Sequence, residues 1–494
     1  MSPSSRGVIT GLVFAVVAAI TVLALNTGWL LPGTDETGVA YLTATPMIVE
    51  GEEPALPWAD WDAESPYSSL RDSGTGVPLA MSLLMRVRPR PFVVALWTVA
   101  ASAALLLLAV GWVAGGVAGI PGAALACALL VISGPSVPLI LGVRPELLAM
   151  AAVGLQLGLM TYRPRGYGAQ GAAAAFGWLC HPAAVGAVAA ALAWPVLRSQ
   201  GRDRGAGLAL ALLPTVLLFA SAPLASGLFV PSLAVTGVGA NETLAGGLRW
   251  LGAGVQGWPG LALGLAVAAG ALVLVIAEAS GSPAAPDDVH WSDPRAHDAL
   301  AEPFRPAALL LGFLLFLTGI AGLGPIGDLG VSWAPALVPV VLLLACAITR
   351  LLRRQAPGRA MAALAACAAI WIVGTTTTTS TRVSHILAEG HGFTSRIWVE
   401  SEVVRWVDNR SAGLGPIYSA QPELLVVQSG IGSRRLPRTL DELDRFVAAW
   451  TERPGPIVLT WNRGSDLTAA DFMDRLPVDE VVATPEGSVL LPSG

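Results

Sequence analysis

Long runs of apolar residues recur along most of this chain of 494 residues. A run of about 20 such residues, coiled as an α-helix, is long enough to cross the hydrocarbon core of a bilayer. Only 13% of the residues are charged, whereas soluble domains carry about a quarter. The sequence therefore predicts a mostly α-helical, polytopic transmembrane bundle of about 10–11 spans. The expected spans are 8–30, 92–114, 117–141, 146–162, 206–228, 259–278, 306–325, 331–349 and 361–378, and a further apolar stretch, 170–197, is long for one span.

Arginine clusters in the connecting segments set the expected orientation, because cytoplasmic loops of membrane proteins carry an excess of basic residues. Three of these clusters lie at 163–165, 198–204 and 350–359. They face one side only if the segment 170–197 crosses the membrane an even number of times. Pro182 interrupts that segment, and a proline breaks helical hydrogen bonding. We therefore expect a hairpin of two short helices there.

This hairpin makes the N-terminus cytoplasmic and puts the loop 31–90, the loop at Arg144 and everything after residue 380 outside. One observation opposes this orientation, because it also puts Arg86, Arg88 and Arg90 on the outer side. The outer loop is acidic. Its end, 77–87, has an amphipathic pattern that is typical of helices lying in the membrane interface.

The composition changes after about residue 380, where segments of helical and strand character alternate. Helical spacing is found in 395–410, 422–430, 439–452 and 467–476, with Thr468 as a candidate N-cap. Strands are expected at 415–420 and 455–461, and a hairpin closes the chain around Pro485–Gly487. We expect a small extracytoplasmic α/β domain at 380–494, following a transmembrane domain at 1–379 that contains the outer loop. The polar, proline-rich stretch 280–304 is expected to be a cytoplasmic linker.

Two adjacent carboxylates, Asp35 and Glu36, follow the first apolar run. A carboxylate that is partly desolvated at a membrane surface can have a raised pKa and can act as a general base. The simpler interpretation is that both residues are solvated at a helix end and have no chemical role. The charge pattern by itself leaves both interpretations open.

The stretch Arg144–Pro145–Glu146 opens a later apolar run on the side that we assign as outside. An arginine there can be an interfacial anchor, or it can hold a phosphate, whose geometry a guanidinium matches bidentately. Proline is favoured in the first turn of a helix, and the helix dipole favours an acidic residue there. Glu146 therefore has a sufficient structural explanation.

Together these stretches resemble the GT-C glycosyltransferases, and among them the arabinosyltransferases of the mycobacterial cell wall. Those enzymes carry an Asp-Asp-Gly-Tyr stretch after the first helix, an Arg-Pro-Glu before a later one, and often a His-Pro further on. The matching stretches here are "DETGVAY" (Asp35 to Tyr41), "GVRPELL" (Arg144 to Glu146) and "CHPAAVG" (His181 and Pro182). Glu36 replaces the second aspartate and Tyr41 is further from the pair. The resemblance covers roughly residues 8–200.

The resemblance implies roles for these residues. Asp35 is the candidate catalytic base, with Glu36 supporting it. Arg144 would hold the donor phosphate and Glu146 would orient Arg144 or a hydroxyl, while Tyr41 and His181 are further candidates. The implied partners are a polyprenyl-phosphate sugar donor, a lipid, glycan or protein acceptor and the lipid bilayer, with no nucleic acid. The implied location is a bacterial inner membrane, and the first sugar to consider is arabinofuranose. Some relatives use a divalent cation, and this sequence does not decide that question; no metal ligands are predicted.

Two other classes of function remain as alternatives. A transporter would have ionisable residues near the middle of its spans and paired broken helices in two related halves. The sequence has one broken segment, and its charges cluster at the outer edge. A non-catalytic scaffold with the GT-C architecture is the second alternative, because the chain is shorter than the arabinosyltransferases and departs from their pattern at Glu36.

Overall fold

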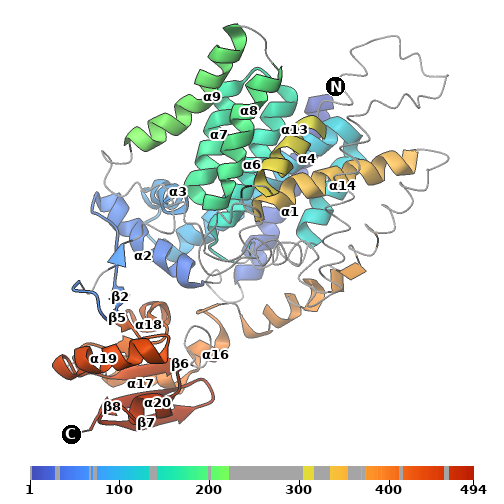
Figure 1. The fold of residues 1–494 in the computed structure, drawn as a ribbon. Coiled ribbons are helices and arrows are strands. Elements are labelled where there is room, and N and C mark those ends of the chain that lie inside the picture. The colour runs from blue at the N-terminus through green and yellow to red at the C-terminus, as the bar shows by residue number, and fades with distance from the viewer. Residues whose placement is uncertain are drawn as a thin grey trace, which may run out of the picture. The chain divides into compact units, whose positions relative to one another are not determined.

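The computed structural model of the chain describes most residues of its first and last parts (Figure 1). The described residues are 3–27, 34–65, 68–69, 75–132, 139, 142–198, 202–221, 304–315, 317, 334–353, 392–410, 415–460 and 467–493, with single positions and short stretches between 369 and 390. The expected span 259–278, the linker 280–304 apart from its last residue, and most of the span 361–378 lie outside them. The chain divides into two compact units. The first comprises 1–25, 71–80 and 96–384, and the second comprises 26–70, 81–95 and 385–494.

The first unit consists of helices that follow the apolar runs. Its helix α4 is kinked at Gly119, whose φ of 73° interrupts it just inside the second of the two expected spans, 92–114 and 117–141. Three helices among the described residues are long and apolar enough to cross a membrane, in α1, α4 and α9. The described helices that lie largely in this unit are α1 (Pro3–Thr27), α4 (Pro91–Ile132), α6 (Pro145–Tyr162), α7 (Tyr167–Cys180), α8 (Val185–Arg198), α9 (Arg202–Ser221), α13 (Phe304–Leu315) and α14 (Ala334–Arg353).

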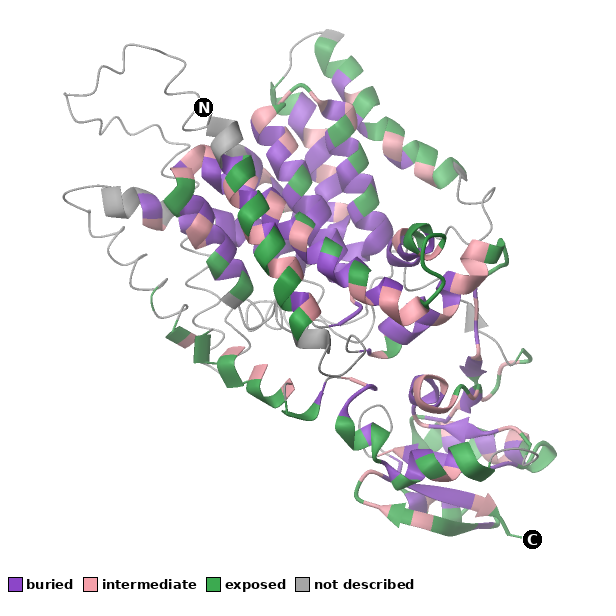
Figure 2. Ribbon diagram, turned by 180° about the vertical axis from the view of Figure 1, so that it is seen from behind, coloured by how far each residue is buried: buried purple, intermediate pink, exposed green. Residues whose placement is uncertain are grey.

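The expected hairpin around Pro182 is present as two helices. Helix α7 ends at Cys180, His181 is its C-cap, a short 3₁₀ turn spans Pro182–Ala184, and α8 starts at Val185. Each helix has 14 residues, which is about 21 Å of helix and shorter than the hydrocarbon core. Helices α6, α7 and α8 lie side by side with largely buried faces (Figure 2).

Helices α1 and α4 approach each other closely through glycines. A Cβ added to Gly111 of α4 would lie 2.5 Å from the Cα of Gly11 in α1, and one added to Gly11 would lie 2.6 Å from the carbonyl oxygen of Leu108. Gly7 and Gly115 meet in the same way one turn further along. Each helix thus presents a Gly-x-x-x-Gly pair, which is the sequence pattern of close helix packing in membranes.

The second unit contains a six-stranded sheet in the order β2-β5-β4-β6-β8-β7. The first four strands are parallel neighbours and the last two form antiparallel pairs. Helix α19 packs Phe446 into a core of aromatic rings from Tyr418 and Phe472. The strands are β2 (Trp58–Asp60), β4 (Tyr418–Ser419), β5 (Ser433–Arg435), β6 (Ile457–Thr460), β7 (Val478–Thr484) and β8 (Gly487–Pro492).

The helices of the C-terminal part follow most of the expected segments. The expected helix 395–410 is two helices that meet at Glu400 and Ser401. Thr468 is the N-cap of α20 and forms a capping box with Asp471. The described helices are α16 (Arg396–Val399), α17 (Glu402–Arg410), α18 (Pro422–Ser429), α19 (Leu440–Glu452) and α20 (Ala469–Met473).

The expected outer loop 31–90 is largely regular structure. It contains α2 (Glu36–Glu50), β1 (Ala55–Leu56), β2, β3 (Ser68–Ser69) and α3 (Gly76–Met85). Strand β2 pairs in parallel with β5, so a segment near the N-terminus and the C-terminal residues share one sheet. Trp58 is buried in β2 and Trp61 packs edge-on against Phe446. Both tryptophan side chains therefore contribute to the packing of this unit.

Candidate functional site

Asp35 is the N-cap of helix α2. Its backbone is extended, and its Oδ1 accepts a hydrogen bond from the backbone N–H of Gly38 at 2.8 Å. An aspartate is among the best N-caps because its carboxylate binds an otherwise unpaired N–H of the first turn. The acidic pair thus begins α2, whereas we expected it to close the first helix, which ends at Thr27. The cap bond also fixes the orientation of the Asp35 carboxylate.

Glu36, the first residue of α2, lies beside an arginine from the C-terminal sheet. Arg435 ends β5, and its Nη1 lies 3.8 Å from Oε1 of Glu36. Its Nε lies 4.0 Å from Oδ1 of Asp60, the residue that it faces in the parallel register of β2 and β5. Its Nη2 donates a hydrogen bond to Oε1 of Glu423. The guanidinium of Arg435 therefore lies within 4.0 Å of three carboxylates.

These three carboxylates differ in their exposure to solvent. The side chains of Glu36 and Asp60 are 54% and 71% exposed, whereas that of Glu423 is 1% exposed and that of Arg435 is 16% exposed. Burial raises the pKa of Glu423 to about 7, Arg435 acts in the opposite direction, and the charge of Glu36 adds to the rise. Arg435 thus lies between one buried carboxyl group, that of Glu423, and two exposed ones. The pKa of about 7 means that Glu423 changes its charge near neutral pH.

Neither Arg435 nor Glu423 was identified in the sequence as a site residue. Glu423 lies in the first turn of α18, after Pro422, where an acidic residue has a sufficient structural explanation. Arg435 lies in a strand of three residues that carries two arginines. The sequence feature that could have identified Glu423 is the pattern Pro-Glu-Leu-Leu, which occurs at 145–148 and again at 422–425. In both copies the glutamate is buried.

Tyr41, a further candidate, lies inside α2 and is fully buried. Its neighbour one turn along, Thr45, donates a hydrogen bond to the Tyr41 carbonyl oxygen. A fully buried phenol contributes to packing in this structure and is not presented to solvent. Tyr41 therefore stays a candidate whose observed contribution is to the packing of α2.

Arg144, Glu146 and His181 belong to the first unit. Arg144 is the N-cap position of α6 and is half-buried, and its side chain does not form the capping hydrogen bond to this helix. Pro145 occupies the first turn, as expected from its preference, and Glu146 follows it in a buried position. The N–H groups of a helix N-terminus and a neighbouring guanidinium both favour an anion.

His181 brings the third expected motif to the start of α6. Its Nε2 lies 3.7 Å from Oε1 of Glu146, and both side chains are buried. Its Nδ1 accepts the backbone N–H of Ala183 at 3.3 Å. Since Nδ1 is the acceptor, a neutral imidazole carries its proton on Nε2, the nitrogen that faces Glu146. Two of the three motifs, Arg-Pro-Glu and His-Pro, are thus brought together by α6 and the α7–α8 hairpin.

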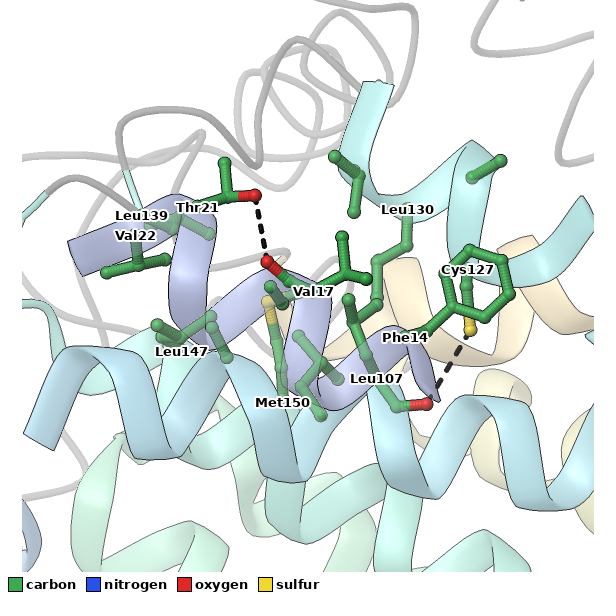
Figure 3. Close-up of a pocket in the computed structure, with 15 residues that line it drawn as sticks. Phe14, Val17, Thr21, Val22, Leu107, Cys127, Leu130, Leu139, Leu147 and Met150 are labelled. Carbon is green, nitrogen blue, oxygen red and sulfur yellow. Dashed lines mark hydrogen bonds between the residues drawn. The ribbon is translucent and has the colours of Figure 1, made fainter. Parts of the chain in front are cut away.

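An apolar cavity of about 290 Å³ lies among α1, α4 and α6 (Figure 3). Phe14, Val17 and Thr21 line it from α1, Leu107 and Leu130 from α4, and Leu147 and Met150 from α6. Its size is at the lower end of the range for small-molecule pockets. Leu147 and Met150 belong to the first two turns of α6, the helix that begins after Arg144.

No group of three His, Cys, Asp or Glu side chains suited to a metal ion occurs among the described residues. The three carboxylates at Arg435 surround a guanidinium, which already supplies positive charge there.

The architecture was compared with those of known proteins. No family model matches the sequence, and no curated protein matches it either. The structure is similar to ArnT from Cupriavidus metallidurans bound to undecaprenyl phosphate, with a TM-score of 0.55 and 12% identity over 97% of both chains. The chain has the GT-C fold.

Two other GT-C structures are similar. The Archaeoglobus fulgidus oligosaccharyltransferase has a TM-score of 0.58 and 11% identity, over 91% of this chain and 69% of that one. The mycobacterial arabinofuranosyltransferase AftD has a TM-score of 0.51 and 15% identity, over 97% of this chain and 40% of that one.

The shared fold is the one that the resemblance of the three short motifs implies. It also agrees with the apolar helices of the first unit, since the GT-C proteins are multi-pass membrane proteins. Identities of 11–15% show a shared fold. The substrates of this chain are a separate question.

Proposed function

We propose that this GT-C chain is a glycosyltransferase that moves a sugar from a polyprenyl-phosphate donor to a cell-envelope acceptor. The observation that carries the proposal is the similarity over 97% of both chains to ArnT in complex with undecaprenyl phosphate. The apolar cavity beside the first turns of α6 supports it, because a prenyl chain needs an apolar binding surface. Arabinofuranose is the first sugar to test, because of the motif resemblance and the similarity to AftD.

The proposed reaction is a displacement at the anomeric carbon of the donor sugar. The oxygen of an acceptor hydroxyl attacks this carbon and forms the new glycosidic bond. The bond from the anomeric carbon to the phosphate oxygen breaks, and polyprenyl phosphate leaves with the bonding electron pair. The acceptor proton passes to a carboxylate of the acidic pair, for which Asp35 is the candidate, with Glu36 holding the acceptor hydroxyl. Positioned general bases of this kind contribute about 10²–10⁴-fold in rate.

The leaving phosphate gains negative charge in the transition state. Arg144 at the start of α6 is the proposed partner for this charge, since preorganised cations at a developing anion are a large source of rate enhancement. Glu146 and His181 form a buried pair at the same helix start. In this proposal they hold the first turn of α6 and so keep Arg144 in place.

The expected setting is a bacterial inner membrane, with the acidic pair and the C-terminal sheet on the outer side. The arginine clusters near residues 163, 200 and 353 support this orientation through the excess of basic residues in cytoplasmic loops. Arg86, Arg88 and Arg90 still argue against it. The proposed acceptor is therefore a lipid, glycan or protein of the cell envelope.

The direct test is to purify the chain in detergent and to measure transfer from radiolabelled polyprenyl-phosphate arabinofuranose to a cell-envelope extract. Polyprenyl-phosphate mannose and glucose and the corresponding nucleotide sugars form the comparison panel. We expect a labelled product with a lipid-linked donor and none with a nucleotide sugar. Labelled solute that crosses proteoliposomes unchanged would favour a transporter. An inactive chain that still binds the lipid donor would favour a scaffold.

A further inference from the structure

Glu36 needs a partner if it is to act at a fixed place. Its side chain is about half exposed, and an exposed glutamate samples several rotamers in water. A functional side chain has to be held within about 0.5 Å of its productive geometry. The N-cap bond fixes Asp35 but makes no contact with the Glu36 side chain. The support for Glu36 must therefore come from another element.

Arg435 supplies this support from the C-terminal sheet. The parallel register pairs Asp60 with Arg435, so β2 and β5 end at the same edge of the sheet. At this edge the guanidinium lies 3.8 Å from Glu36 and 4.0 Å from Asp60. Helices α2 and α18 also pack against each other. The acidic pair is thus attached to the sheet through both packing and charge.

Glu423 holds Arg435 from the buried side. It accepts the hydrogen bond from Nη2, and its own side chain is almost inaccessible to solvent. A guanidinium has five N–H donors in a rigid plane, so fixing one end fixes the direction of the others. Glu423 therefore determines where the remaining donors of Arg435 point, which is toward the exposed carboxylates.

We propose that Arg435 is a positioning residue for Glu36 of the acidic pair, and that Glu423 holds Arg435 in the required orientation. The inference rests on the proposed function, because it assigns Glu36 a part in glycosyl transfer. The raised pKa of Glu423 adds a consequence. As the pH rises through about 7, Glu423 becomes charged and competes with Glu36 for Arg435, with Asp60 as the third acid facing the same guanidinium.

The test is a double-mutant cycle on the transfer rate of the full chain, with polyprenyl-phosphate arabinofuranose as the probe. Arg435→Gln is expected to lower kcat by roughly 10- to 100-fold, as misplacement of a reacting group does, with little change in the KM for the donor. In a Glu36→Gln background the same substitution should have no further effect, because Arg435 then has nothing to position. Arg475→Gln is the matched control. It removes another arginine–carboxylate pair of the same unit, with Asp444, and should leave the rate unchanged.

Two further measurements separate positioning from general stability. The pH profile of kcat should contain a step near pH 7 that is absent in Glu423→Gln. Arg435→Lys keeps the positive charge and replaces Arg435→Gln in the test if that variant does not fold. Its transfer rate should lie between those of Arg435→Gln and the wild type. Additive losses in the double mutant, or a pH step that persists in Glu423→Gln, would overturn the positioning role and leave the proposed function intact. A wild-type chain without transfer from any lipid-linked donor would overturn the proposed function and the positioning role together.

Discussion

At Asp35 one carboxylate is both the N-cap of α2 and the candidate proton acceptor. Asp35→Asn keeps a good N-cap and removes the base, whereas Asp35→Ala removes both. Loss of an N-cap costs about 1 kcal/mol. Amide hydrogen exchange at the start of α2 should therefore be about fivefold faster in Asp35→Ala and unchanged in Asp35→Asn. Equal acceleration in both variants would mean that the cap depends on the charge of the aspartate.

Glu423 gives a second prediction at this scale. Its pKa is about 7 in the folded chain, against 4.5 as the ordinary value. The folded state thus keeps a proton that the unfolded state releases. Stability from this group is complete below about pH 4.5 and is lost as the pH rises to about 7, by about 3 kcal/mol. Thermal unfolding of the full chain in detergent should show this decline, and Glu423→Gln should flatten it. A decline of the same size in Glu423→Gln would assign it to other groups.

The residues of the candidate site were only partly predictable. Asp35 and Arg144 follow or precede apolar runs, and this pattern is visible in a sequence. Arg435 and Glu423 are not predictable in this way, because the contacts of Arg435 with Asp60 and Glu423 depend on which strand and which helix lie beside β5. Strands β2 and β5 have three residues each and are far apart in the chain. Their pairing leaves no periodic signal.

At the scale of elements, the glycine contact between α1 and α4 carries a prediction. Gly11→Ala would place a methyl group against the backbone of Leu108, and overpacking of this kind costs typically 1–3 kcal/mol. We expect a lower melting temperature for the purified chain. Gly312→Ala in α13 is the control, because nothing lies within 4 Å of the added Cβ. A gain in stability in Gly11→Ala would show that these helices do not pack through their glycines.

The elements differ in how well their sequences predict them. Long apolar runs and the break at Pro182 predict α4, α7 and α8, because hydrophobic length and proline act locally. Helix α2 was missed although Asp35 is a typical N-cap, because the acidic stretch 31–90 between two apolar runs was expected to be a loop. Its helical form is supported by burial of seven residues, among them Tyr41 and Thr45.

At the scale of the whole molecule, the orientation in the membrane is the main expectation to test. In a cysteine-free background, single cysteines at the exposed positions Gly205 and Glu452 report the two sides. A membrane-impermeant maleimide added to intact cells should label Glu452→Cys only, and added to inverted vesicles it should label Gly205→Cys only. Labelling of both cysteines from one side would contradict the expected even number of membrane crossings by the hairpin at 170–197.

The decisive experiment compares the rate of sugar transfer from polyprenyl-phosphate arabinofuranose by the wild-type chain, Asp35→Asn and Arg144→Ala. We expect transfer by the wild type and a loss of about 100-fold or more in each variant, with melting temperatures unchanged. Unchanged transfer in both variants would contradict the assignment of the acidic pair and Arg144 to the reaction.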